Sequence, residues 1–187
     1  MAITAPRTKS VVYDDLQLFP DTSNRRFELV EGVLLVSPAP TVEHQANVMN
    51  LSFALRAAAG EEHLVLAAPV DYLISDVTYF EPDIVVALDA EVGTERIERT
   101  PLLLVEVASP STRLIDQGTK RLAYEAAGVP EYWLVDPGGP TLTVLRLVDG
   151  RYEDVAVVTG DDAYQATYPF PVTIVPGRLG RRRPPKA

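Results

Sequence analysis

The run "PLLLVEVAS", residues 101–109, constrains the fold more than any other stretch of the chain. Its continuous apolar character over the length of one strand predicts a β-strand buried on both faces, at the centre of a sheet covered by helices. Side chains alternate across a strand, so Glu106 shares a face with Leu104 and stands in apolar surroundings. An unpaired carboxylate there is costly, and we therefore expect Glu106 to have a cationic or hydrogen-bonding partner.

Two substantial helices are predicted, one before and one after this strand in the sequence. Thr41 is an N-cap for a helix over residues 42–59, which Gly60 ends. His44, Val48, Leu51 and Leu55 recur at helical spacing along it. A second helix is expected from Leu114 to Ala127, and a short one in "VVYDDLQLFP" near the N-terminus.

Strand-like segments fill most of the remaining chain. The segment "RRFELVEGVLLVSPAP" predicts a hairpin bent at Glu31-Gly32. Further β-like runs are "HLVLAAPVDYLIS", "YFEPDIVVALDA", "EYWLVDP", "LTVLRLV" and "YEDVAVV". Alternation of these runs with two substantial helices predicts an α/β or α+β domain with a mixed central sheet flanked by helices, with β-hairpins at its N- and C-terminal ends.

Length and charge limit the possibilities further. The 187 residues are expected to form one domain over residues 1–177, followed by a basic, disordered tail over residues 178–187. A net charge of −9 argues against a broad electrostatic grip on nucleic acid, although the tail could contact phosphate. We expect a cytoplasmic protein without a membrane segment, because the sequence has no cysteine, no signal-like start and no long apolar run.

A second acid, Asp83, enters the β-branched run of "YFEPDIVVALD" directly after Pro82. Acids at the ends of two neighbouring strands can hold Mg²⁺, because this ion prefers a few carboxylate oxygens together with water. Such an ion would stabilise charge on a phosphoryl group and activate a water molecule. By spacing alone, Asp83 and Glu106 are a weak indication of a metal site.

Lys120 lies in the predicted helix that follows the Glu106 strand. If Ile115, Thr119, Leu122 and Ala126 form the inward stripe of this helix, Lys120 lies at the border of the stripe and its ammonium could reach a neighbouring site. The alternative is a solvated lysine that pairs with Asp116, one turn earlier.

Several segments together resemble one known family. They are "FELVEG", Pro82-Asp83, "EVASPST" from Glu106, "DQGTK" from Asp116, and "YEAAGVPEYWLVDP" from Tyr124. The set resembles the Uma family of endonucleases, in the PD-(D/E)xK restriction-endonuclease-like superfamily, over roughly residues 10–155. The string from Glu106 onward is specific, whereas the isolated Pro-Asp pair is not.

The resemblance implies a restriction-endonuclease-like fold and assigns roles to individual residues. The superfamily pattern has an Asp on one strand and Glu-x-Lys on the next, but this chain has Ala108 in the lysine position. Similar families are thought to move the lysine to the adjoining helix, which makes Lys120 the candidate that orients or activates the attacking water. Glu28 is favoured over Glu31 as an additional metal-site acid, and His44, otherwise a core-edge histidine, becomes a candidate lining residue.

Two hypotheses about function follow. The first is a Mg²⁺-dependent endonuclease, with Mn²⁺ as a possible substitute, that hydrolyses phosphodiester bonds of nucleic acid, with DNA as the expected substrate. Asp83, Glu106 and Glu28 would hold the ion. The second is a catalytically silent nuclease fold that acts as a binding or assembly module, as a homodimer through its C-terminal strands. The acidic composition favours the second hypothesis, and the presence of the acids with Lys120 favours the first.

Overall fold

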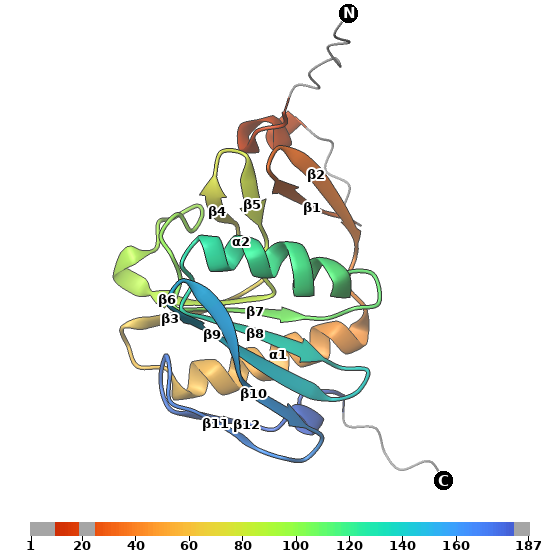
Figure 1. Ribbon diagram of the computed structural model, residues 1–187, viewed down its shortest axis with the longest axis vertical. Coiled ribbons are helices and arrows are strands. Elements are labelled where there is room, and N and C mark those ends of the chain that lie inside the picture. The colour runs from red at the N-terminus through yellow and green to blue at the C-terminus, as the bar shows by residue number, and fades with distance from the viewer. Residues whose placement is uncertain (1–9, 19–24, 182–187) are drawn as a thin grey trace, which may run out of the picture.

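A six-stranded sheet forms the centre of the molecule in the computed structural model, which describes residues 10–18 and 25–181 (Figure 1). Its strands are β3 (His63–Ala67), β6 (Ile84–Leu88), β7 (Leu103–Val107), β8 (Glu131–Asp136), β9 (Thr141–Val148) and β10 (Arg151–Thr159). Their order is β10-β9-β8-β7-β6-β3. Strand β7 pairs parallel with β8 and antiparallel with β6, so the sheet is mixed, as predicted.

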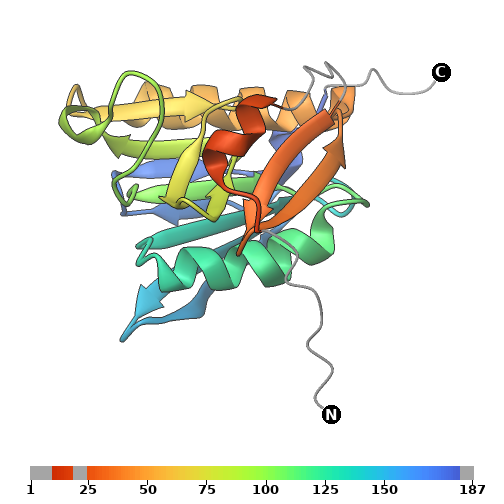
Figure 2. The ribbon, with the colours of Figure 1, turned by 90° about the horizontal axis from the view of Figure 1, so that it is seen from above.

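Strand β7 is buried on both faces, which confirms the interpretation of the apolar run. Leu103, Val105 and Val107 pack on the side of helix α1 (Val42–Ala58), and Leu104 packs on the side of helix α2 (Arg121–Ala126). Figure 2 shows the two helices on opposite sides of the sheet. The strand is therefore shielded from water by a helix on each face.

Helix α1 begins and packs as its sequence predicts. The Thr41 hydroxyl accepts a hydrogen bond from the backbone N–H of His44 at 3.2 Å, which satisfies one of the free donors of the first turn. Val48, Leu51 and Leu55 are buried against the sheet. The Thr41 cap and this packing together fix the N-terminal turn of α1, which contains His44, at one end of the sheet.

A second, four-stranded sheet has the order β2-β1-β5-β4. Its strands are β1 (Arg25–Val30), β2 (Val33–Pro38), β4 (Tyr72–Ser75) and β5 (Thr78–Phe80). The β1–β2 hairpin turns at Glu31 and Gly32, whose φ values of 48° and 79° confirm the predicted bend. The chain passes between the two sheets at the segments that contain Pro69 and Pro82, because proline has no N–H to continue a ladder.

These crossings divide two runs that the sequence pattern presents as single segments. The first run forms β3 in the large sheet and β4 in the small one, and the second forms β5 in the small sheet and β6 in the large one. Asp83 follows Pro82 and directly precedes β6. It therefore lies where the chain enters the large sheet.

The second predicted helix differs from expectation in geometry and orientation. It begins as a π-helix, η3 (Ile115–Lys120), and continues as α2. The predicted inward stripe is wrong: Leu122 is 61% exposed, while Asp116, Lys120 and Tyr124 are buried. The wider π-helical turn changes which residues share a face, and ion pairs rather than apolar periodicity determine which of them are buried.

The C-terminal part adds two hairpins and a short turn of helix. Strand β9 pairs with β10, and β11 (Tyr164–Ala166) pairs with β12 (Val172–Ile174). They are followed by η4 (Pro176–Arg178); the other short helices are η1 (Tyr13–Leu18), the helix expected near the N-terminus, and η2 (Asp89–Glu91). Leu179 is buried, and its carbonyl accepts a hydrogen bond from Asn50 at 2.7 Å. The beginning of the expected tail, residues 178–181, thus packs on α1, and residues 182–187 lie outside the described residues.

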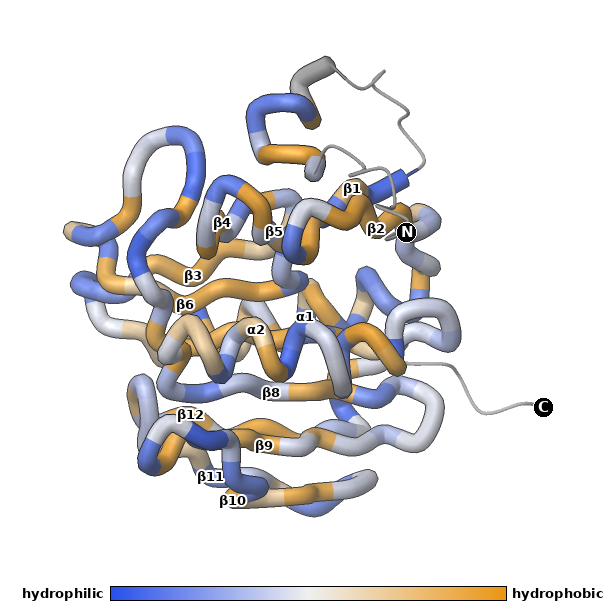
Figure 3. Tube along the Cα trace, turned by 45° about the horizontal axis from the view of Figure 1, so that its top comes forward, coloured by the Kyte–Doolittle hydropathy of each residue, from blue (hydrophilic) through white to orange (hydrophobic). Residues whose placement is uncertain are grey.

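Apolar strands form the interior of the molecule, as the hydropathy of β6 shows in Figure 3. Trp133 and Tyr132 of β8 are fully buried, and the Trp133 indole donates to Glu131 at 2.8 Å. Within the described ranges, no helix is long and apolar enough to cross a membrane.

The β1–β2 turn provides a test of this fold. Gly32 has φ of 79°, and a Cβ added there would lie 2.6 Å from the Ser10 Cβ. Gly32→Ala should therefore lower the free energy of unfolding by roughly 1–2 kcal/mol, measured by urea denaturation. Gly139→Ala is the matched control, because a Cβ there meets no atom within 4 Å. Equal stability of the two variants would contradict the described turn.

Candidate active site

Three acids meet in one buried cluster, two from strands β1 and β7 and one from the residue before β6. Because β6 and β7 are antiparallel, the start of β6 lies beside the end of β7, and this places Asp83 next to Val107. The Asp83 Oδ2 accepts the Val107 N–H at 2.8 Å. Glu28 joins from β1 and accepts the Glu81 N–H at 3.0 Å through its Oε1. Glu28, Asp83 and Glu106 are each no more than 3% exposed.

Lys120 reaches this cluster from η3. Its Nζ lies 2.8 Å from Oε1 of Glu106 and 2.8 Å from Oε1 of Glu28. The Tyr124 hydroxyl donates to the same Glu106 oxygen at 3.0 Å. Glu106 thus has the cationic partner that its burial requires.

Arg26 and His44 hold the third acid, Asp83. The guanidinium of Arg26 donates to Oδ1 at 3.1 and 3.2 Å, and His44 Nε2 lies 3.1 Å from Oδ2. Sequence reasoning missed Arg26, although period-two alternation places it on the same face of β1 as Glu28. Glu31, the alternative to Glu28, is exposed in the hairpin turn, whereas Glu28 is buried.

Burial and ion pairing set the protonation of the cluster. Burial raises the pKa of Glu106 well above its usual value, although the charge of Lys120 opposes this shift. Burial also acts to raise the pKa of Asp83, but the His44 hydrogen bond and the Arg26 charge outweigh it and leave that pKa lowered. Burial disfavours the Lys120 ammonium, yet Glu106 and Glu28 raise its pKa. Lys120 therefore remains protonated and acts as a hydrogen-bond donor.

Asp116 is an additional member of the cluster that sequence reasoning treated only as a possible lysine partner. It is 1% exposed, and within residues 10–18 and 25–181 neither carboxylate oxygen has a well-aligned hydrogen bond, although the Thr112 side chain lies near enough to lower its pKa. Its Oδ1 lies 3.9 Å from the Lys120 Nζ. Burial raises the pKa of Asp116 to about 6, against the opposing charge of Lys120.

A cleft of about 280 Å³ is lined by Arg26 and His44, the two residues that bond to Asp83. The turn after β7 also lines it, and there Ser109, Ser111 and Thr112 bond to one another and to backbone N–H groups. The remaining lining residues are Ser37, Pro38, Ala39, Pro40, Thr41 and Pro110. The cleft thus presents a guanidinium, an imidazole and hydroxyl groups beside the buried acids.

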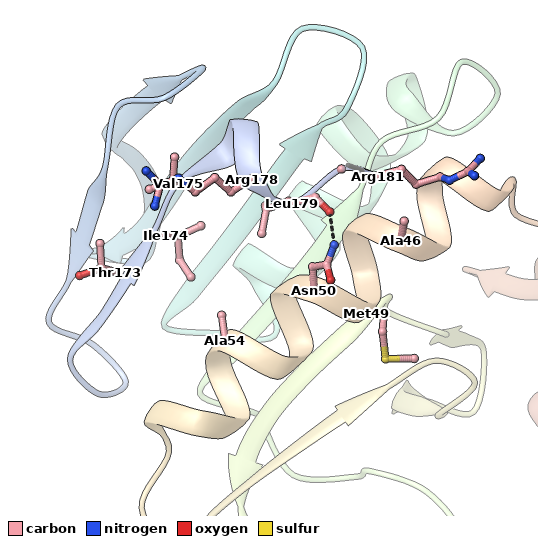
Figure 4. Close-up of a pocket in the computed structure, with 11 residues that line it drawn as sticks. Ala46, Met49, Asn50, Ala54, Thr173, Ile174, Val175, Arg178, Leu179 and Arg181 are labelled. Atoms are coloured by element: carbon pink, nitrogen blue, oxygen red, sulfur yellow. Dashed lines mark hydrogen bonds between the residues drawn. The ribbon is translucent and has the colours of Figure 1, made fainter. Parts of the chain in front are cut away.

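A larger hollow of about 890 Å³ lies between α1 and the C-terminal segment (Figure 4). Its lining consists of apolar side chains with Asn50, Thr173, Arg178 and Arg181, and it shares no residue with the acid cluster. Figure 4 shows Asn50 bonded to the carbonyl of Leu179 on one side of it. Size alone therefore does not identify the candidate site.

Comparison with known proteins identifies the family. Residues 13–175 match the family model Uma2, described as "Putative restriction endonuclease". The chain belongs to the Uma2 family. This match confirms the resemblance drawn from the motifs around Glu106 and Lys120, whereas a search of curated proteins found no match.

A solved structure supports the fold of this Uma2 protein. A crystal structure described as a "putative nuclease belonging to DUF820" from Anabaena variabilis superposes with a TM-score of 0.71 and 19% sequence identity. The match covers 85% of this chain and 89% of the other. At this identity the similarity concerns the fold, and it confirms the predicted restriction-endonuclease-like class.

The cluster fits a divalent cation in chemistry and charge. Glu28, Asp83, Glu106 and Asp116 offer carboxylate oxygens, the ligands that Mg²⁺ prefers. When all four are ionised, these buried acids outnumber the two permanent cations beside them, Arg26 and Lys120, by two charges, which a divalent ion would balance. In the part of the chain that the structure describes, no group of three or more potential ligands is already spaced around an ion. Lys120 instead lies between Glu28 and Glu106.

The raised pKa of Asp116 predicts a pH-dependent stability. Since the folded pKa of about 6 exceeds the ordinary value of 3.8, the native state binds more protons than the unfolded state between these values, and stability falls as pH rises through this window. Asp116→Asn should therefore raise the free energy of unfolding by about 3 kcal/mol near pH 7, with the gain vanishing below about pH 4. Urea denaturation across this pH range measures it. The exposed Asp162→Asn should show no such gain, and a loss of stability in Asp116→Asn at neutral pH would contradict the prediction.

Proposed function

We propose that this protein is a Mg²⁺-dependent endonuclease that hydrolyses phosphodiester bonds of nucleic acid, with DNA as the expected substrate and Mn²⁺ as a competent substitute ion. One observation carries the proposal: Lys120, from the helix after β7, lies 2.8 Å from both Glu28 and Glu106 in a buried cluster beside a polar cleft. A buried lysine shared by two acids from different sheets is an expensive arrangement that a merely structural core does not need.

The proposed ligands of the ion are Asp83, Glu106 and Glu28. They are the acids whose side chains converge from β1, β7 and the residue before β6. When bound, a divalent ion supplies stabilisation of negative charge on the phosphoryl group and lowers the pKa of bound water. The excess negative charge of the cluster supports this assignment.

The protein's own side chains would position the substrate and the attacking water. Because Lys120 is protonated, we assign it the role of donor to water or to a phosphate oxygen, rather than that of a general base. His44 and Arg26 fix the orientation of Asp83 through both of its oxygens. Preorganised donors of this kind contribute to catalysis without having to reorient during the reaction.

The cleft beside the cluster is the proposed position of the scissile phosphate. Arg26 is 18% exposed at its side chain, so its guanidinium can contact a phosphate while it still bonds to Asp83. The hydroxyls of Ser109, Ser111 and Thr112 face the same cleft and can donate to phosphate oxygens. The cleft thus supplies the positive charge that the chain as a whole lacks.

Ion binding tests the proposed ligands. Calorimetric titration with Mn²⁺ should show binding to the wild type that falls at least tenfold in Asp83→Asn and in Glu106→Gln, because each loses a charged ligand oxygen. Glu131→Gln is the matched control, since Glu131 is fully buried on the neighbouring strand but bonds to Arg146 and Trp133. Wild-type binding no tighter than that of the two ligand variants would overturn the metal assignment.

A plasmid-nicking assay tests the chemistry of the same variants. The wild type should cleave only with Mg²⁺ or Mn²⁺, and activity that survives Glu106→Gln would point to a contaminant. A wild type that binds the ion yet cleaves neither plasmid, single-stranded DNA nor RNA would favour the alternative function, a catalytically silent module that assembles as a homodimer.

The position of the lysine can be tested separately. Lys120→Ala should lower the cleavage rate by roughly 10²–10³, as expected for loss of one preorganised donor. Adding Ala108→Lys in that background places an ammonium where the superfamily pattern has one, and part of the activity should return. Circular dichroism confirms folding of both variants. Full activity of Lys120→Ala would remove Lys120 from the mechanism.

A further inference from the structure

The buried carboxylate of Asp116 is the feature of the cluster that the proposed mechanism leaves unexplained. Neither of its oxygens forms a well-aligned hydrogen bond with a described residue, and its polar neighbours are the Thr112 side chain and the Lys120 ammonium. Buried polar groups nearly always have well-formed hydrogen bonds, since leaving them without one costs stability. Its backbone is well fixed, because the Tyr132 hydroxyl donates to the Asp116 carbonyl at 3.1 Å. The carboxylate is therefore held near Lys120 with capacity for a closer partner.

The Lys120 ammonium occupies the position between Glu28 and Glu106 in which a bound cation would have to lie. It bonds to Oε1 of Glu28 and Oε1 of Glu106, two of the oxygens assigned to the ion. A divalent ion and an ammonium on the same carboxylate oxygens would repel each other strongly in this buried site. Ion binding at Glu28 and Glu106 therefore requires the ammonium to withdraw.

Asp116 is placed to receive the withdrawn ammonium. It lies one turn before Lys120 on the inward face of η3, and its Oδ1 is 3.9 Å from Nζ. A movement of about 1 Å would bring this pair to hydrogen-bond distance, near 2.9 Å. Phe80 supports such a movement, since its ring lies 5.6 Å from Nζ and offers an electrostatically favourable surface to a cation.

We propose that Asp116 is the alternative ion-pair partner of the Lys120 ammonium, a positioning residue that pairs with the lysine when a divalent cation occupies Glu28 and Glu106. The inference rests on the proposed function. Lys120 then has two states: it bridges the two glutamates in the ion-free protein and pairs with Asp116 in the ion-bound protein. In the second state the ammonium remains charged and close to the ion site, where it can serve the attacking water.

A double-mutant cycle on ion affinity distinguishes this role from others. Calorimetric titration with Mn²⁺, and with Ca²⁺ as a non-catalytic probe, compares wild type, Asp116→Asn, Lys120→Met and the double variant. Asp116→Asn should weaken ion binding about tenfold in the wild-type background, because the ammonium loses its alternative ion-pair partner. The same change should have no effect in the Lys120→Met background, where there is no ammonium to move. Glu125→Gln on the adjoining helix is the control and should leave affinity unchanged.

Each other outcome has a definite meaning. Equal weakening by Asp116→Asn in both backgrounds would make Asp116 a direct ligand and overturn the proposal. Unchanged affinity in the wild-type background would reduce Asp116 to a structural residue. A wild type that binds neither ion overturns the proposed function itself, and this inference with it.

A structure of the Mn²⁺-loaded wild type keeps the test independent of whether Lys120→Met folds. The proposal expects the Lys120 Nζ within about 3.2 Å of an Asp116 oxygen and no longer bonded to Glu106. An ammonium that remains on Glu106 beside a bound ion would overturn it.

Discussion

The ion pairs of one buried ammonium join the parts of this molecule. Lys120 extends from η3 to Glu106 of the large sheet and to Glu28 of the small sheet, so one charge links a helix and both sheets. Burying a lysine and two carboxylates is favourable only when all of them are paired with good geometry. The relative position of the two sheets at this point and the inward face of the second helix therefore both depend on this contact.

The crossing of the chain between the sheets supplies the second constraint. Pro82 ends the pairing of the segment after β5, and the next residue, Asp83, stands where β6 begins. Because β6 runs antiparallel to β7, the beginning of one strand and the end of the other share an edge. An acid just before β6 and an acid near the end of β7 are thus brought together by topology, although 22 residues separate them in the sequence.

Sequence reasoning succeeded where local physics decides. The burial of β7, the capped start of α1, the Glu31-Gly32 turn and the alternation that separates Glu106 from Val105 all depend on near neighbours in the chain. It failed on the second helix, because an apolar stripe was assumed where a buried Lys120 and Asp116 instead face inward. A π-helical turn and a partner such as Glu28, 92 residues away, leave no periodic pattern in the sequence. Arg26 is an intermediate case. Period-two alternation with Glu28 predicts the face of β1 on which it lies, but its partner Asp83 is determined by the tertiary fold.

The distribution of charge bears on how an acidic protein would act on the polyanionic substrate proposed for it. With a net charge of −9, long-range attraction does not concentrate nucleic acid at the surface. Any productive contact must therefore come from short-range groups, and Arg26, His44 and the hydroxyls of the cleft are gathered beside the acids. The acids that repel a phosphate also outnumber the cations of the cluster, and a bound divalent cation would supply the missing positive charge. In the proposed mechanism the ion would be as much a condition for substrate approach as for chemistry, and occupancy of the acids by the cation would be linked to binding of the phosphate.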